Sequence, residues 1–477
     1  MEFIKRFRYL IVLVLLIVPI VLRGLWFYHG IPTPSSVKFP DFASNTIPQP
    51  PISTAAPEKI TTSAGKVVVV DFLHSNQFAP SEIDSFVAAL TQRGARVEIA
   101  SGDPPLATRL KYASAYVVFS PTSDFSVDEV NLVRNFVASG GRLIIFTDPT
   151  RGTSTYDYNS GTYNNLPDAD TTNNLLAPFG ISVNNDYLYN LVKSEGNFRN
   201  VLFGDFSSNP ITSDLNQLAF YGVHSVEAGN GTRLIVGDEN TFSSLTDSAG
   251  PGMAAAALSA DGNVLVLGDF SFLIPPYNTV ADNQILIRNI ADFALGGIRT
   301  HSVADFPYVF DRTVYVIPTG GLQMTADTLA PFAGLQNALG ATSTSLVMRT
   351  TAPAEGDLLV TGSLTPGKDL LPYIKSFHLG LDDPSTVVIP DLGTVSRTGV
   401  GLLLYQNTPT RNTLILLTDL PADLPALINL LSSGDLSSCV TQGDIGVCSI
   451  GYGGSYYPEP TYEIPLDLTP TPTPPGG

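Results

Sequence analysis

Three polar side chains that can do chemistry follow a predicted buried strand in the stretch VVVVDFLHSNQF. Four valines run into Asp71, and His74 and Asn76 come shortly after it. An imidazole titrates near neutral pH, so His74 can serve as a general base or a ligand. The alternative interpretation is that these side chains only form a cap or a turn where the strand ends.

The same pattern recurs after other predicted strands. In an open parallel sheet, ligands bind beyond the carboxyl ends of the strands. We therefore expect the following residues to converge on one cleft: Asp71, His74 and Asn76; Ser120 and Ser123; Asp148 and Arg151; Asp269 and Ser271. The predicted ligand-binding residues within this set are His74, Asn76, Asp148, Arg151 and Asp269.

Catalysis and cofactor binding have weaker support in the sequence. His74 and Asp148 would be the base and acid of a serine hydrolase. Its nucleophile would be Ser120 or Ser123, but no GxSxG turn frames either serine. The acids of DFLH, TDP and GDF match no metal-binding spacing, and the glycine-rich stretches lack the Lys and Ser or Thr of a phosphate-binding loop. We predict no catalytic residue, no metal and no other cofactor.

Polar residues also occur in ADNQILIRN, at the start of a predicted helix. Asp282 is expected to cap this helix, and Asn283 and Asn289 to tie its first turns to neighbouring loops. A ligand is not needed to explain them.

Strand and helix patterns alternate in the elements that must position these residues. KVVVVDF, ARVEIA, ASAYVVFSP and RLIIFTDP are predicted strands. Between them lie APSEIDSFVAALTQRG and SVDEVNLVRNFVASGG, predicted amphipathic helices, the second with Ser126 as its N-cap. This alternation predicts a parallel sheet covered on both faces by helices. The polar stretch 150–170 is long for a connection, which is typical of a lid or a disordered insertion.

Further strands are predicted in ISVNNDYLY, TRLIVGDE, GPGMAAAALSA and GNVLVLGDFSFL, before a closing helix in DNQILIRNIADFALGG. A second, smaller α/β segment begins near Asp311, with strands in RTVYVIPTG, GDLLVTGS, STVVIPD, GVGLLLYQN and NTLILLTD.

Cys439 and Cys448 are the two cysteines of the chain, and their short separation predicts a disulfide, because no His lies nearby to complete a zinc site.

The N-terminus predicts a membrane anchor. Lys5, Arg6 and Arg8 precede an uncharged run, and with Arg23 and the aromatic residues up to Tyr28 the segment 9–28 is about 20 residues long, enough for a bilayer span. We favour an uncleaved signal anchor over a cleaved signal peptide. The basic residues predict a cytoplasmic N-terminus at 1–8, with the rest of the chain outside the cell membrane.

Length and composition limit the remaining possibilities. A chain of 477 residues with 44% hydrophobic residues is expected to hold more than one folded core. The formal net charge of −18 disfavours nucleic acid as a partner. We predict a Pro/Ser/Thr-rich linker at 29–65, α/β domains at 66–298 and 299–452, and a disordered Pro/Thr-rich tail at 453–477.

Several stretches between residues 66 and 298 carry a family resemblance. The most specific are GDFSFL, DNQILIRN shortly after it, and NPITSDLNQLAFYG. With the strands and helices at 67–151, they resemble the bacterial family called domain of unknown function 4350. That family looks related to the glutamine-amidotransferase-like fold of gliding-motility ABC transporter auxiliary components and of the N-terminal domain of an intraflagellar-transport subunit.

The resemblance implies a flavodoxin-like sheet and a binding or scaffolding role. Class I amidotransferases use a cysteine nucleophile, and residues 1 to 438 contain no cysteine, so glutaminase chemistry of that kind is excluded. The expected function is non-enzymatic binding or assembly at the cell envelope, with a transporter protein as a candidate partner. The alternatives are an envelope hydrolase or carbohydrate-active enzyme that uses the cleft near His74, and a solute-binding protein that closes its two domains.

Overall fold

The computed structural model describes residues 2–28, 65–157, 161–249, 252–322, 325–340, 342, 344–434 and 436–451. The chain divides into two compact units, Met1–Gln49 and Pro50–Gly477. The predicted tail at 453–477 and the predicted linker at 29–65, apart from Gly65, lie outside the described residues. The second unit contains two α/β lobes with separate hydrophobic cores.

The first unit contains helix α1 (Glu2–Phe27). Within its stretch Lys5–Phe27, a window of 18 residues has a mean hydropathy of 2.7, and the apolar side chains of the helix are exposed. A helix of this length and composition can cross a bilayer, and a signal sequence near an N-terminus shares these properties. The predicted membrane-length apolar helix is therefore present, while its cleavage and its orientation remain predictions.

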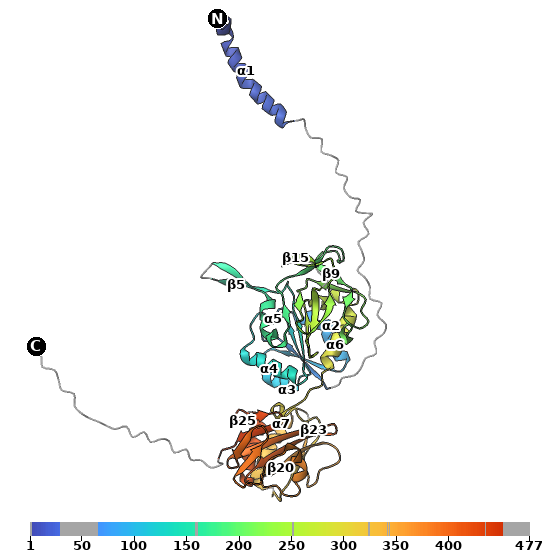
Figure 1. Cartoon of the computed structure of the whole chain (residues 1–477), viewed down its shortest axis with the longest axis vertical. Helices are drawn as coiled ribbons and strands as arrows, with labels where there is room; N and C mark the ends of the chain where they lie inside the picture. Colours follow the sequence, from blue (N-terminus) through green and yellow to red (C-terminus); the bar gives the residue numbers. More distant parts are fainter. Residues whose placement is uncertain are drawn as a thin grey trace, which may run out of the picture. The chain divides into compact units, whose positions relative to one another are not determined.

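The first lobe, residues 65–300, is built on a sheet with parallel central strands (Figure 1). Neighbouring parallel strands follow in the order β2 (Arg96–Ala100), β1 (Val67–Asp71), β3 (Ala115–Phe119), β4 (Arg142–Phe146) and β17 (Val264–Leu267). Antiparallel strands extend this sheet: β16 (Ala254–Leu258), β13 (Thr232–Val236) and β10 (Asp205–Phe206). β12 (Val226–Glu227) also pairs with β16, and β7 (Ser182–Val183) pairs with β12.

The prediction of a parallel sheet is thus right for the centre of the sheet and wrong for one edge. β16 and β17 are joined by a short turn, and so short a connection permits only antiparallel pairing. Short apolar strands look alike in sequence whichever way they run.

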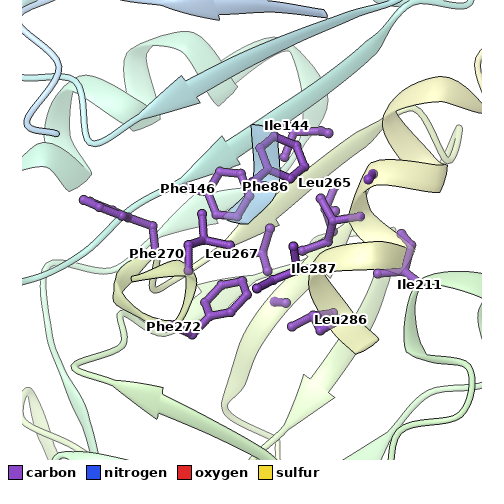
Figure 2. Close-up of a cluster of buried hydrophobic side chains, with 14 of the residues drawn as sticks. Phe86, Ile144, Phe146, Ile211, Leu265, Leu267, Phe270, Phe272, Leu286 and Ile287 are labelled. Carbon is purple, nitrogen blue, oxygen red and sulfur yellow. The ribbon is translucent and has the colours of Figure 1, made fainter. Parts of the chain in front are cut away.

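Helices cover both faces of this sheet. On one face, α2 (Asp84–Gln92) and α6 (Asn283–Leu295) pack on Val68 and Val70; Figure 2 shows Phe86 of α2 and Ile287 of α6 among the side chains of this core. The other face is covered by three helices: α3 (Leu106–Tyr112), α4 (Val127–Ala138) and α5 (Asp168–Leu176). Side chains alternate along a strand, so each residue just beyond a strand can be assigned to one of these faces.

Small sheets complete the first lobe. The predicted insertion at 150–170 forms a hairpin of β5 (Thr153–Asp157) and β6 (Thr162–Leu166), which projects from the lobe in Figure 1, followed by the start of α5. The stretch ISVNNDYLY contains two short strands, β7 and β8 (Leu188–Asn190), in place of one. The others are β14 (Thr241–Ser243), β15 (Thr246–Ala249), β9 (Asn200–Phe203) and β11 (Leu218–Tyr221).

The second lobe, residues 301–451, has its own sheet in the order β19 (Leu346–Met348), β18 (Val314–Pro318), β20 (Asp357–Ser363), β24 (Arg411–Thr418), β23 (Val400–Thr408), β26 (Ile445–Ser449) and β25 (Cys439–Gln442). Helices α7 (Ala326–Gly340) and α9 (Leu424–Ser433) pack on one face. α8 (Leu371–Ile374) and the hairpin of β21 (Thr386–Ile389) and β22 (Gly393–Ser396) pack on the other. The predicted strand STVVIPD therefore lies outside the main sheet.

The predicted disulfide closes the last hairpin of this lobe. Cys439 of β25 and Cys448 of β26 are directly paired across the two strands and are joined by a disulfide bond. The local pairing of two adjacent strands brings the cysteines together, which is why their sequence separation was sufficient to predict the bond.

Candidate functional site

The residues that follow the parallel strands separate onto the two faces of the first sheet. Asp71 lies two residues after Val69 along β1, so its side chain is on the same face as that of Val69, which is covered by α3, α4 and α5. Asp148 and Asp269 follow Phe146 and Leu267 at alternate positions and lie on the opposite face. The sheet itself therefore separates two groups that were expected to converge on one cleft.

His74 lies in a closed cluster of acids and aromatic rings. Its Nδ1 is 2.9 Å from Asp71 Oδ2, and its Nε2 is 3.5 Å from Glu129 Oε1. The imidazole also stacks on Phe125, with 3.6 Å between ring centroids. Only 4% of His74 is exposed, and Asp71 is fully buried. Both ring nitrogens thus have a carboxylate neighbour.

The electrostatics of this cluster favour a charged imidazole. Burial disfavours the imidazolium, but the hydrogen bond to Asp71 and the charges of Asp71 and Glu129 outweigh it and raise the pKa of His74. Burial alone would raise the pKa of Glu129, but its hydrogen bonds to Ser126 and its contact with His74 lower it. Ser126 is the N-cap of α4, as predicted, and Glu129 completes a capping box with it. The cluster is a buried ion pair tied to a helix start.

Asn76 and the serines serve the same closed loop. Asn76 accepts a hydrogen bond from the His74 backbone N–H at 3.2 Å and donates one to the Phe119 carbonyl at 3.1 Å. Ser120 is fully buried, and Ser123 donates its backbone N–H to the His74 carbonyl. These contacts join the loop after β1 to the loop after β3. They give no support to a catalytic triad built on His74.

Asp148 and Asp269 form a buried acidic pair on the opposite face. Ser271 links them, because its hydroxyl donates to Asp148 Oδ2 at 2.7 Å and its backbone N–H donates to Asp269 Oδ1 at 2.6 Å. Asp269 also accepts the Tyr221 N–H at 2.8 Å, and Asp148 accepts the Thr150 N–H at 2.8 Å.

Two buried carboxyl groups so close together hold a proton more tightly than isolated ones. Burial raises the pKa of Asp148, and burial together with the negative charge of Asp148 raises the pKa of Asp269 well above its usual range. Arg151, the predicted cationic member of the site, pairs instead with Glu82 at 2.7 Å and lies 4.7 Å over the ring of Phe270. The acidic pair therefore organises the loops after β4 and β17.

A second histidine-acid pair lies at the same edge of the sheet. His224 Nε2 is 3.1 Å from Asp168 Oδ1, and both side chains are 1% exposed. Asp168 Oδ2 also accepts the backbone N–H of Asp148 at 2.8 Å. Burial lowers the pKa of His224, but the hydrogen bond to Asp168 and the charges of Asp168 and Asp186 raise it overall.

This second pair lines a cavity of about 500 Å³. The cavity lies at the base of the β5–β6 hairpin, and its polar lining includes Thr150, Thr153, Asp168, Asp170, Asn185 and His224. Its lining contains no lysine or arginine among the residues that the structure describes. None of the five predicted ligand-binding residues contributes to that lining, although Asp148 contacts Asp168 directly.

Sequence reasoning missed both members of this pair. Asp168 begins α5 and His224 lies in the loop after β11, so neither residue follows one of the central parallel strands. One signal was present: Gly268 directly follows the predicted strand VLVL. A side chain at Gly268 would collide with the carbonyl oxygen of His224, so glycine permits the close approach of that loop. No sequence pattern shows which loop approaches it.

The polar residues around α6 are structural. Asp282 was predicted to cap this helix, but its side chain makes no capping hydrogen bond. It accepts the backbone N–H groups of Asn216 and Gln217 instead. Asn283 bonds both backbone groups of Ala219, and Asn289 donates to carbonyls at 211 and 213. The expectation that these asparagines tie the helix to neighbouring loops is confirmed. Among the described residues, no group of three or more His, Cys, Asp or Glu side chains is placed to hold a metal ion.

Comparison with known proteins finds solved structures at low similarity to this chain. No family model and no curated protein matches the sequence. The N-terminal domain of mmIFT52 has 13% sequence identity and a TM-score of 0.39, and the match covers 49% of this chain and all of that one. A ThuA-like protein from Bacteroides uniformis has 12% identity and a TM-score of 0.29, with 50% and 94% covered. PurLQS from Thermotoga maritima has 9% identity and a TM-score of 0.25, with 48% and 99% covered. No function is inferred from similarity at this level.

Proposed function

We propose that this chain is a membrane-anchored, extracytoplasmic binding protein of the cell envelope, with a non-enzymatic role. The observation that carries the proposal is the polar cavity at the base of the β5–β6 hairpin, about 500 Å³ in volume. A concave site with a few polar groups at the carboxyl edge of a parallel sheet is the usual place for a ligand in such folds.

The lining of this cavity favours a ligand rich in hydroxyl or amino groups. Asp170 offers an exposed carboxylate acceptor beside the buried Asp168, and Thr150, Thr153 and Asn185 offer short polar side chains. These groups suit a sugar or an amino sugar and disfavour an anion, because the lining carries two acids and, among the described residues, no lysine or arginine.

The compartment is supported by two separate features. α1 is long and apolar enough to span a membrane, and the Cys439–Cys448 disulfide is typical of an oxidising environment. Lys5, Arg6 and Arg8 before the span favour a cytoplasmic N-terminus, which places both lobes outside the membrane.

We further propose that the first lobe is flavodoxin-like and related to the domain of unknown function 4350 family and its glutamine-amidotransferase-like fold. The strand order β2-β1-β3-β4-β17 supports this, because it follows the 2-1-3-4-5 order of flavodoxin-like sheets. A role as a transporter accessory component rests on the resemblance alone, since one fold hosts many functions.

Acid-base chemistry in the same cavity is a second candidate, in line with the envelope hydrolase considered above. The observation that favours it is the buried Asp168–His224 pair beside the cavity. Because the pKa of His224 is raised, this histidine would act as a general acid. His74 is a poor candidate for such a role, since carboxylates flank both of its ring nitrogens.

The test is thermal unfolding of the full chain in nanodiscs with sugars, amino sugars, peptidoglycan fragments, amino acids and nucleotides. A ligand present at 100 times its Kd should stabilise the folded state by about 2.7 kcal/mol. We expect a sugar or amino sugar to give this shift, Asp170→Ala to reduce it and His74→Ala to leave it unchanged.

The same samples separate the candidates. Chemical conversion of the stabilising compound would favour the acid-base function. If no compound shifts the unfolding midpoint while a membrane protein co-purifies with the chain, the protein is a scaffold and ligand binding in the cavity is rejected.

A further inference from the structure

An apolar surface lies on the small sheet of strands β8, β14 and β15 in the first lobe. Leu188 and Asn190 of β8 point inward and are buried, whereas Tyr189 between them is partly exposed. Tyr189 pairs with Phe242 of β14, and their rings stack with 5.4 Å between centroids. The outer face of this sheet is therefore aromatic.

Exposed aliphatic side chains extend this face at both ends. Leu191 is 72% exposed and Val192 is 70% exposed where β8 ends, and Leu245 is 63% exposed at the turn between β14 and β15. Phe198 packs edge-on against Tyr189 and is itself 42% exposed. We name as the apolar rim the residues Tyr187, Tyr189, Leu191, Val192, Phe198, Phe242 and Leu245.

Cationic side chains border the apolar rim. The guanidinium of Arg199 lies 4.1 Å over the ring of Tyr187 and 5.6 Å from that of Phe198. Lys193 follows Val192, is half exposed and pairs with Asp238 at 3.0 Å. Aliphatic loop tips surrounded by tyrosine and by long basic side chains have the composition of protein segments that lie in the interfacial region of a bilayer.

The chain keeps a bilayer within reach of this surface. α1 ends at Phe27 and the first lobe begins at Gly65. The stretch 29–64 reaches at most roughly 130 Å even when fully extended. Tethering of this kind makes contact between lobe and membrane an intramolecular event, so a weak surface affinity is sufficient.

We propose that the apolar rim is a membrane-docking surface, which rests the first lobe on the outer leaflet of the bilayer that holds α1. The inference rests on the proposed anchoring of α1. Insertion of apolar side chains drives the contact, because the chain carries a net charge of −18 and is not attracted to anionic lipid. The ligand is therefore the acyl-chain boundary of zwitterionic lipid.

The experiment measures fluorescence quenching by brominated phosphatidylcholine in nanodiscs that contain the full chain. Trp26 is the single tryptophan of the sequence and lies in α1, so quenching of the wild type reports on the anchor alone. In a Trp26→Phe background, Leu191→Trp and Leu245→Trp report on the apolar rim. Val127→Trp is the matched control, because Val127 is 77% exposed on α4, away from β15 within the same lobe (Figure 1).

We expect the tryptophans at 191 and 245 to lose most of their fluorescence and the tryptophan at 127 to keep it. Quenching at Trp26 alone supports the anchor and overturns the docking surface. A blue shift of the emission of the tryptophans at 191 and 245 without quenching means that protein, either a partner or a second copy of this chain, covers the apolar rim. This result also overturns the membrane-docking surface. If Trp26 is not quenched, but preformed vesicles of the same lipid quench the tryptophans at 191 and 245, the proposed anchoring by α1 is wrong and the docking surface is supported.

Discussion

Two buried histidine-acid pairs lie at the same edge of the first sheet, and one of them borders the cavity at the base of the β5–β6 hairpin. His74 has Asp71 on one ring nitrogen and Glu129 near the other, with Phe125 stacked on its ring. His224 has Asp168 on one ring nitrogen and lines a space of about 500 Å³. Residue type and burial are therefore the same, while access to a ligand differs.

The connections between elements explain the difference. The loop after β1 is short, and its backbone bonds directly to the loop after β3 through Gln77 and Ser120. The connection after β4 is much longer and contains the β5–β6 hairpin, whose base forms part of the cavity wall. A titratable pair becomes a candidate site where the chain beside it leaves room, because short loops close over the strand ends.

The largest expected effect on stability comes from removing Asp168, the acid of the Asp168–His224 pair that lines the cavity. Asp168→Ala leaves the His224 imidazolium and the Asp148 N–H without their acceptor, so we expect a loss of about 3–5 kcal/mol in the free energy of unfolding. Denaturant unfolding followed by circular dichroism measures it. Asp170→Ala, an exposed position of the same cavity, should change stability by about 0.5 kcal/mol or less. Equal effects in the two variants would mean that the pair is not a structural unit.

A substitution in the Asp71–His74 pair should lower stability without changing ligand binding in the cavity. His74→Ala leaves the buried Asp71 carboxylate without its cation and removes the stack on Phe125, at a cost of about 2–3 kcal/mol. The stabilisation of the full chain by a cavity ligand should remain. Loss of that stabilisation in His74→Ala, in samples that are still folded, would contradict the distinction between the two pairs.

The pH dependence of stability distinguishes the two histidines from ordinary ones. Both have a pKa raised above the unfolded value near 6.5, so their stabilising contribution is complete below that pH and is lost as the pH rises through the folded-state pKa. We expect the free energy of unfolding of the wild type to fall over this window. His74→Gln should reduce the slope of the free energy of unfolding against pH. An unchanged slope would show that His74 does not titrate between pH 6 and pH 9. Urea unfolding from pH 6 to pH 9 gives the measurement.

The acidic pair on the opposite face should produce the smallest effect. The raised pKa values of Asp148 and Asp269 mean that stability is lost as the pH rises from about 4 through the folded-state values. Asp148→Asn keeps an acceptor for Thr150 and can donate to Ser271, so it should flatten this slope and add about 0.5–1 kcal/mol at neutral pH. A steeper slope in this variant would show that the two carboxyl groups do not share a proton.

Local features of this protein were readable from its sequence. The valine-rich first strand, the cap of α4 at Ser126 and the apolar helix α1 appear where the residue patterns predict them. The Cys439–Cys448 bond belongs with them, because neighbouring strands of one hairpin bring the two cysteines together. In each case the interacting residues are close in the sequence, so propensity, periodicity and spacing contain the information.

The arrangement of the site was decided only by the tertiary structure. Asp168 and His224 are 56 residues apart, and the pair forms because the start of α5 meets the loop after β11, which itself packs closely on Gly268. The separation of His74 from Asp148 depends on which sheet face each residue occupies, and the cavity depends on how the β5–β6 hairpin leaves the sheet. Such distant contacts follow from the packing of whole elements and from connection geometry, which residue types at the ends of strands do not specify.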